Sequence, residues 1–320
     1  MRFKKIALII LVVLIIGALI YAISYRSEEK EVEWMSKDKL NVVVTNFVAY
    51  DILRNIANDN INLKNLLSPG VEAHGYEPTA QDLVAIENSD IFIYIGGNME
   101  NWTDKVLNSL NMSNTKVLRL MDTIDVIEEQ EVDGAEPEEE DEGETEYDEH
   151  IWNSPTNTIT IIQSLAELIS EKDEENRETY QTNARKYIED VKEVQAKIQE
   201  IVNNKVRNRL IFGDKMPMQY FLNEFELTAS AAFNGCSTET EPSVATVAYL
   251  VEKVKEENIP VVLYIELSQG KIAKAIAEET GAEIMQIQSL HNISKEDFNN
   301  GETYVSLMTR NLDALKKALQ

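Results

Sequence analysis

Cysteine and histidine are scarce in this 320-residue chain, which contains one cysteine, Cys236, and three histidines. A single cysteine has no partner within the chain, so disulfide bonds do not hold the fold together. The histidines are the residues to follow, because imidazole is the commonest side-chain ligand of transition metals.

Basic residues are also few, with 30 Lys and Arg against 56 Asp and Glu and a formal net charge of −26. This balance excludes nucleic acid as a partner, because phosphate binding needs a basic surface. There is no Gly-x-Gly-x-x-Gly after a strand, no P-loop and no Gly-x-Ser-x-Gly elbow. The commonest nucleotide-binding and hydrolase motifs are therefore absent.

The long hydrophobic run at the N-terminus, from Ile6 to Ile23, follows three basic residues. Eighteen uncharged residues are enough to cross a bilayer as a helix, and the basic residues predict that the rest of the chain lies outside the cell. We expect residues 1–25 to be an uncleaved membrane anchor or a cleaved signal segment, followed by a linker over 26–39. No cysteine follows the run, so a lipid anchor is not expected.

Strand-like and helix-like segments alternate along the rest of the chain, as in LNVVV followed by NFVAYDILRNIA. This alternation predicts an α/β fold in which mostly parallel sheets are flanked by helices. We expect an N-terminal lobe over 40–170 and a C-terminal lobe over 206–320. Between them, apolar residues recur at helical spacing within 171–205, which predicts one long linking helix. Ligands of such sheets bind beyond the carboxyl ends of the strands, here in the cleft between the lobes.

The segment 128–149 breaks the pattern, because 14 of its 22 residues are acidic. Such a segment cannot bury enough apolar surface to order itself, so we expect a mobile loop. Its simplest role is a solvated tether. The alternative is a weak reservoir that concentrates cations near the cleft.

Five polar residues that follow strands or leave loops are candidate metal ligands in this cleft: His74, His150, Asp214, Glu266 and Glu239. Imidazoles together with carboxylates predict a site for zinc or manganese. A lone histidine is more often a surface or core residue. We interpret the third histidine, His291 in SLHNISKED, as such an ordinary loop residue.

Three segments carry a resemblance to a known family: PGVEAHGYEPTAQDL, DIFIYIGGNMENW and YDEHIWNSPTN. They resemble the metal-binding receptors of zinc and manganese ABC transporters, the cluster A-I solute-binding proteins, and the resemblance covers about residues 40–320. It implies that His74 and His150 are metal ligands. It also implies that Tyr76 and Glu77 orient the loop that carries His74.

The chain departs from this family at the other two ligands. The third ligand of the family, a His or Glu, falls at Lys215, which cannot bind a metal while protonated, so Asp214 is the substitute. The fourth falls near Gly270, which leaves Glu266 as the replacement. Glu239 is a further candidate if it turns inward.

The resemblance implies a monomeric receptor that binds a divalent metal outside the cell and delivers it to an ABC permease. We expect Zn²⁺, with Mn²⁺ as the alternative, and binding that weakens as the pH falls through about 6. Three other functions stay open: a manganese-specific receptor, a metal-dependent adhesion or sensor protein, and a metallohydrolase. An open coordination position beside a general base would distinguish the hydrolase.

Overall fold

The computed structural model describes residues 17, 34–36, 38–135, 146–235, 237 and 241–320. Among these residues no helix combines the length and the apolar character needed to span a membrane. The predicted anchor or signal segment and most of the predicted linker lie outside the described residues, so both stay predictions.

The N-terminal lobe is built on a parallel sheet of four strands in the order β2-β1-β3-β4. Its elements are β1 (Leu40–Val44), α2 (Phe47–Ala57), β2 (Ile61–Asn65), α3 (Ala80–Glu87), β3 (Ile91–Tyr94), α4 (Trp102–Ser109) and β4 (Lys116–Arg119), followed by the short 3-10 helix η4 (Ile151–Asn153) and by α5 (Pro155–Lys172). The strand β3 is buried along its whole length, as expected for a central strand covered on both faces. The helix α3 begins at a capping box between Thr79 and Asp82.

The C-terminal lobe repeats this plan with a second parallel four-stranded sheet in the order β6-β5-β7-β8. Its elements are β5 (Arg209–Met216), α7 (Gln219–Glu224), β6 (Thr228–Asn234), α8 (Val244–Glu256), β7 (Val261–Ile265), α9 (Lys271–Thr280), β8 (Glu283–Ile287), α10 (Lys295–Asn299) and α11 (Tyr304–Leu319). The two sheets of parallel strands flanked by helices confirm the predicted fold class.

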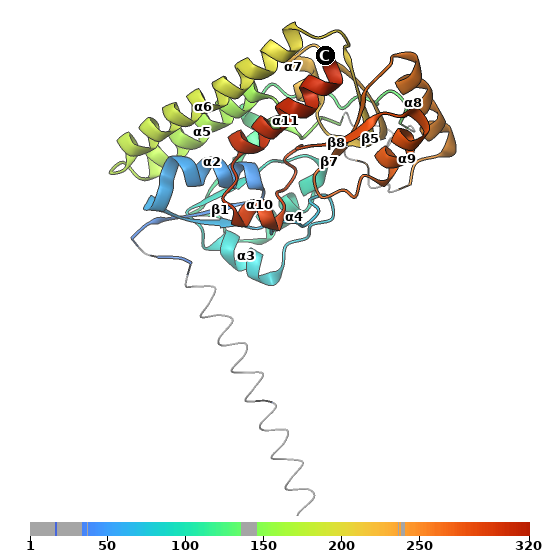
Figure 1. The fold of residues 1–320 in the computed structure, drawn as a ribbon. Helices are drawn as coiled ribbons and strands as arrows, with labels where there is room; N and C mark the ends of the chain where they lie inside the picture. The colour runs from blue at the N-terminus through green and yellow to red at the C-terminus, as the bar shows by residue number, and fades with distance from the viewer. Residues whose placement is uncertain (1–16, 18–33, 37, 136–145, 236, 238–240) are drawn as a thin grey trace, which may run out of the picture.

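The linking helix is α6 (Arg177–Asn203), whose 27 residues correspond to about 40 Å at 1.5 Å per residue. Figure 1 shows α6 beside α5 and reaching from the side of α2 to the region of α7, so it runs along both lobes. Its buried residues are Tyr180, Ala184, Tyr187, Ile188, Val191, Val194, Ile198 and Val202. They recur at helical spacing and pack against α2, α5 and α11. The exact domain boundaries stay a prediction.

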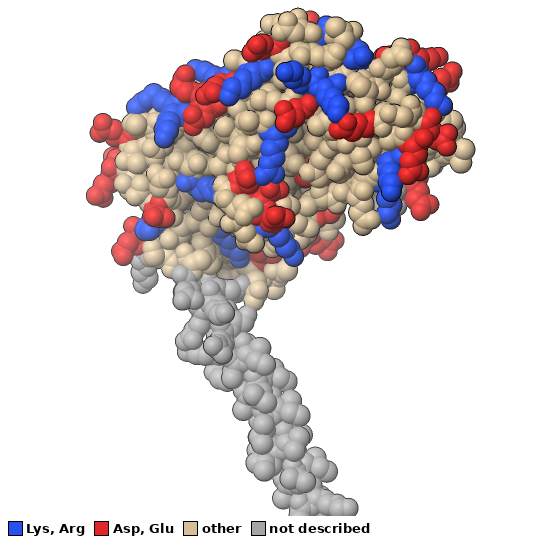
Figure 2. All heavy atoms as spheres, viewed as in Figure 1, with Lys and Arg blue, Asp and Glu red and all other residues tan. Residues whose placement is uncertain are grey.

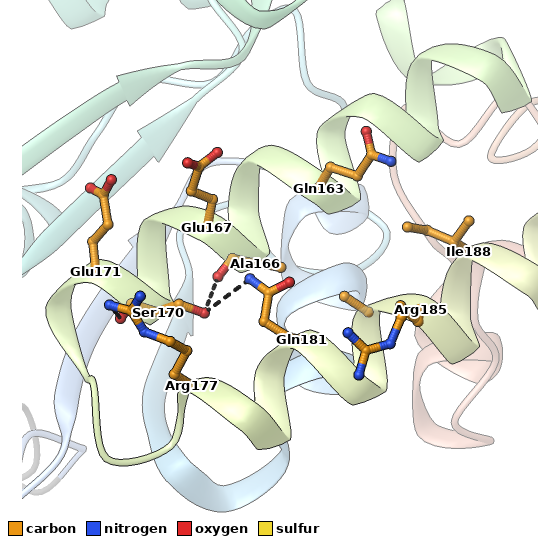
Figure 3. A pocket seen from close by; sticks show the side chains of 10 residues that line it. Gln163, Ala166, Glu167, Ser170, Glu171, Arg177, Gln181, Arg185 and Ile188 are labelled. Carbon is orange, nitrogen blue, oxygen red and sulfur yellow. Dashed lines mark hydrogen bonds between the residues drawn. The ribbon is translucent and has the colours of Figure 1, made fainter.

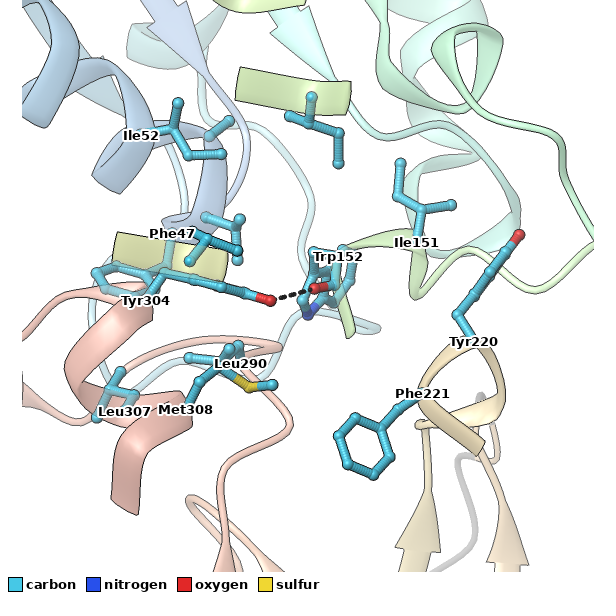
Figure 4. Close-up of a cluster of buried hydrophobic side chains, with 14 of the residues drawn as sticks. Phe47, Ile52, Ile151, Trp152, Tyr220, Phe221, Leu290, Tyr304, Leu307 and Met308 are labelled. Carbon is cyan, nitrogen blue, oxygen red and sulfur yellow. Dashed lines mark hydrogen bonds between the residues drawn. The ribbon is translucent and has the colours of Figure 1, made fainter. Parts of the chain in front are cut away.

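One continuous hydrophobic core joins the lobes, with Trp152 at its centre (Figure 4). The Trp152 side chain is 2% exposed, and its indole N–H donates a 2.9 Å hydrogen bond to the carbonyl of Ser289. Its own carbonyl accepts a 3.2 Å bond from the Tyr304 hydroxyl of α11. The segment that follows His150 is therefore anchored to the C-terminal lobe by packing and by hydrogen bonds.

The acidic segment differs from the predicted mobile loop at both of its ends. Residues 128–135, here called the strap, are ordered and cross to the C-terminal lobe, where Asp133 bonds Arg209 at 2.6 Å and accepts from Tyr249 at 2.6 Å. The return of the chain pairs with the strap in an antiparallel bridge between Glu128 and Tyr147. Cross-lobe hydrogen bonds supply the ordering that burial of apolar surface could not. The centre of the segment, 136–145, lies outside the described residues.

Positive and negative side chains are interspersed over the face shown in Figure 2. Several form exposed pairs along one helix, such as Lys192 with Glu189 and Lys197 with Glu193 on α6. Pairs of this kind contribute little to stability. Seven acidic residues are concentrated instead in 136–145.

Candidate metal centre

A groove of about 530 Å³ lies between α5 and α6 (Figure 3). Some of its polar side chains bond one another or the helix backbone: Gln181 donates to the Ser170 hydroxyl at 3.4 Å and Arg177 to the Ser170 carbonyl at 3.1 Å. It holds no group of metal-ligating side chains, since the one such group among the described residues lies elsewhere. We therefore place the functional site at that group.

The group consists of all three histidines of the chain: His74, His150 and His291. One ligand atom from each lies within 4.8 Å of the other two. The Nε2 atoms of His150 and His291 approach to 2.5 Å, and the ring centroid of His74 lies 5.1 Å from that of His291. Three imidazoles from distant parts of the chain therefore converge between the lobes.

His74 lies in the loop between β2 and α3, and its side chain is only 7% exposed. Its Nδ1 atom lies 2.9 Å from the Glu72 carboxylate, whereas its Nε2 atom is buried without a hydrogen-bond partner. Tyr76 and Glu77, the two residues expected to orient this loop, differ in their contacts. Tyr76 donates to Asp82 at the start of α3 and so orients the loop, whereas the Glu77 side chain is exposed to solvent.

The His74 loop is tied to the loop that carries His291. The Asn292 side chain donates 2.8 Å hydrogen bonds to the carbonyls of Ser68 and Val71. The backbone N–H of Gly70 donates to the Ile293 carbonyl at 2.7 Å. These cross-lobe bonds fix the two imidazoles relative to each other.

His150 precedes η4 and is 1% exposed. The Asp148 carboxylate lies 2.7 Å from its Nδ1 atom and also accepts its backbone N–H at 2.7 Å. The Asp148 carbonyl in turn accepts a 2.8 Å bond from the Tyr220 hydroxyl in α7. His150 therefore presents Nε2 to the centre with its Nδ1 side occupied.

A Gly-Gly pair after β3 also positions His150. The adjacent Glu149 carboxylate accepts bonds of 2.9 and 3.0 Å from the Met99 N–H. Gly97 has φ +80°, and a Cβ atom there would lie 1.9 Å from the Glu149 carboxylate. A glycine is therefore required both for the left-handed backbone and for the close approach of Glu149.

His291 lies after β8 in a turn that wraps around the buried carboxylate of Glu266. Glu266 accepts the backbone N–H groups of Ser289 at 2.6 Å and His291 at 3.0 Å, and the Ser289 hydroxyl at 2.8 Å. The same hydroxyl lies 3.0 Å from the His291 Nδ1 atom. An Nδ1–H can therefore donate to Ser289, which donates onward to Glu266 and leaves Nε2 free.

The electrostatics of the three rings are unequal. Burial alone would lower the pKa of His150, but the Asp148 carboxylate outweighs it and the pKa is raised. Burial, followed by the charges of His150 and His74, lowers the pKa of His291 well below its ordinary value. Without metal, a proton shared at the 2.5 Å contact therefore belongs to His150, which donates it to a neutral His291.

The arrangement fits zinc. Each free nitrogen is Nε2, and each Nδ1 has an oxygen partner that fixes the tautomer, which is the usual support of a metal-binding histidine. Zinc takes nitrogen ligands at 2.0–2.1 Å, so tetrahedral ligands lie about 3.3 Å apart. The 2.5 Å contact has to widen by about 1 Å, a shift open to a side chain.

Of the predicted ligands, the structure brings together His74 and His150 only. Glu266 lies beside the centre, but its oxygens are used by Ser289 and His291. Asp214 accepts the Lys215 N–H at 2.9 Å, and neither Asp214 nor Glu266 belongs to the described metal-ligating group. Glu239 lies outside the described residues. Gly270 is the N-cap of α9 and packs against the Tyr264 ring.

Sequence reasoning missed His291, although a signal was present. Each histidine has its Nδ1 partner two residues earlier, in the pairs Glu72-x-His74, Asp148-x-His150 and Ser289-x-His291. Such spacing lets one turn of chain supply both the ligand and the group that orients it. SLH also follows the carboxyl end of a strand, where ligands of parallel sheets are expected.

We predict that Asp148→Asn weakens zinc binding about tenfold, within the 10–100-fold usual for groups that orient a metal ligand. The amide keeps the hydrogen bonds but removes the negative charge that raises the basicity of His150. A competition titration against a chromogenic chelator measures the change. Asp173→Asn, which alters a hydrogen-bonded carboxylate at the α5–α6 turn, is the control and is expected to have no effect. Equal affinities for wild type and Asp148→Asn would contradict the assigned role.

Comparisons with known proteins identify the family to which the chain belongs. The chain matches the family described as ZnuA, zinc-uptake complex component A, periplasmic, over residues 42–318. The high-affinity zinc uptake system protein ZnuA of Bacillus subtilis (strain 168) is 30% identical over 288 residues, covering 88% of each chain. The zinc-binding lipoprotein AdcA of Streptococcus pneumoniae (strain ATCC BAA-255 / R6) is 29% identical over 280 residues, but the chain spans just over half of it, 56%.

A solved structure shows the same architecture. The crystal structure of the Zn(II)-bound ZnuA-like domain of Streptococcus pneumoniae AdcA aligns with a TM-score of 0.72 and 29% identity, covering 88% of this chain and 99% of that domain. The predicted resemblance to metal receptors of this type is confirmed by sequence and by fold. The chain belongs to the ZnuA family.

Proposed function

We propose that this protein captures zinc outside the cell and delivers it to the permease of an ABC transporter. The observation that carries the proposal is the convergence of three buried imidazoles, each with its Nδ1 side occupied and its Nε2 side available. Imidazole nitrogen suits zinc, whereas manganese prefers sites richer in carboxylate oxygen. Membership of a zinc-uptake family supports the same choice.

Release of the metal must follow from small movements. The strap, the Asn292 bonds and α6 all cross between the lobes, so a wide hinge opening would break many contacts. Each imidazole stands on a different segment of the chain, so a small shift of one loop is enough to separate them. We therefore propose that docking to the permease displaces the His74 or His291 loop and opens the centre.

We propose a binding protein rather than an enzyme. A zinc hydrolase needs an open coordination position with a general base beside it. Glu266 is the predicted carboxylate ligand that lies beside the centre. Its oxygens accept three hydrogen bonds that shape the His291 turn, so it is not free to act as a base. The predicted monomeric state and the N-terminal membrane attachment are part of this proposal.

The test is a metal titration of the full-length chain, solubilised in mild detergent and stripped with a chelator. We expect one Zn²⁺ per chain, bound more tightly than Mn²⁺, and loss of this tight site in the His74→Ala/His150→Ala double variant. Tighter binding of manganese would favour the manganese receptor. Zinc binding unchanged in the double variant would place the ion in the acidic segment and refute the centre.

A further inference from the structure

The histidine centre has three protein ligands among the described residues, whereas zinc in closed sites is four-coordinate. What occupies the fourth position depends on the side chains around it. A cavity of about 10 Å³, room for about one water-sized group, lies beside the centre. Its polar lining includes His291, Glu72, Glu266 and Lys215.

Lys215 is the positively charged residue in the lining of this cavity. An irregularity in β5 accounts for the position of its side chain. The pairing of β5 with β6 shifts register between Phe212 and Lys215. Bulges of this kind are frequent next to functional sites, where they re-aim a side chain. At the same place a Cβ atom on Gly213 would lie 2.3 Å from the Ala273 Cα atom, so α9 packs directly on the irregular backbone.

Lys215 lines the same cavity as His291 and Glu72, so its positive charge lies next to the centre. No described carboxylate forms an ion pair with Lys215. One oxygen of Glu72 is bonded to His74, and both oxygens of Glu266 are bonded to the 289–291 turn. A cation bound by neutral imidazoles would therefore face an ammonium group across the cavity.

We propose that a small monovalent anion, of the size of chloride, fills the fourth position and bridges the zinc to Lys215. An anion there would attract both cations, whereas a neutral ligand would leave them in repulsion. The size of the cavity limits the ligand to one atom or a few. This inference rests on the proposed function, because it concerns the state in which zinc is bound.

The test measures zinc affinity at chloride concentrations from zero to about 0.15 M, with perchlorate replaced by chloride so that the ionic strength stays constant. We expect chloride to tighten zinc binding by the wild-type full-length chain about tenfold, the size of one charge-assisted interaction. Lys215→Met should reduce this response to less than about twofold. The control Lys274→Met, which removes an exposed ammonium of α9, should keep the full response.

A second readout is the visible spectrum of the cobalt-substituted protein, which reports the ligands directly. Chloride should shift the absorption bands of wild type and leave those of Lys215→Met unchanged. Zinc binding that ignores chloride in the wild type would overturn the inference, as would a Lys215→Met variant that binds zinc more weakly in every salt, because Lys215 would then be a ligand itself. Absence of zinc binding in any salt would refute the proposed function and this inference with it.

Discussion

His291→Ala is expected to weaken zinc binding about 100-fold, the result with the largest consequence for the proposed centre. The apparent free energy of zinc binding at tetrahedral sites with four protein ligands is about 10–16 kcal/mol, or roughly 3 kcal/mol for each ligand. Loss of one ligand therefore corresponds to about 100-fold in affinity. His291 is 7% exposed, its Nε2 atom lies 2.5 Å from that of His150, and the metal-ligating group among the described residues contains only one other histidine, His74. Isothermal calorimetry with a competing chelator measures the change.

Ser289→Ala is the matched comparison for this experiment. It removes the hydroxyl that lies 3.0 Å from the His291 Nδ1 atom but keeps the imidazole, so a loss of about tenfold is expected. Thermal melting of both metal-free variants verifies that they are folded. An affinity of His291→Ala within about twofold of wild type would show that the metal is held without this residue, and the three-histidine assignment would be wrong.

Zinc affinity is expected to fall about tenfold for each pH unit below the pKa of His150, because the metal must displace one proton from that ring. The Asp148 carboxylate raises this pKa despite burial, so the loss begins above pH 6.5 rather than near the pH of about 6 expected from unperturbed histidine. His291 adds little to the effect, because burial and the neighbouring rings lower its pKa. From pH 7.5 to 5.5 the expected loss is at least about tenfold and at most about 100-fold.

Calorimetry in buffers of different ionisation enthalpy tests the mechanism, because it counts the protons released when zinc binds. About one proton should be released below the pKa of His150 and fewer above it. In Asp148→Asn the onset of the loss should move to lower pH, since the main charge that raises the pKa of His150 is gone. An affinity that is constant between pH 7.5 and 5.5 would contradict the assignment of the shared proton to His150.

The elements of the fold were predictable because their signals are local. The β-branched run of β3, the helical spacing of apolar residues along α6 and the Thr79 cap of α3 each operate within one or a few turns of chain. The ordering of the strap was not predictable in this way. Its composition indicates a mobile loop, whereas bonds to the C-terminal lobe hold it in place, among them those of Asp133 to Arg209 and Tyr249, 76 and 116 residues away.

The candidate site shows the same division. His74 and His150 stand in motifs that resemble known metal receptors, so the sequence alone identified them as candidates. His291 stands in no such motif, and it reaches the centre through a contact between residues 141 positions apart. Glu266 was predicted as a ligand because it follows a strand, but the Ser289–His291 turn folds back over it and uses its oxygens.

By itself, the amino-acid sequence determined the two parallel α/β lobes, the long helix between them and the first two histidines of the centre. These features arise from the periodicity and turn chemistry of neighbouring residues, which act over short stretches of chain. Only the tertiary structure decided the third histidine, the oxygen partner of each ring and the placement of Lys215 in the lining of the cavity beside His291. The side chains that meet in the cleft come from both lobes, and packing of the lobes brings them together.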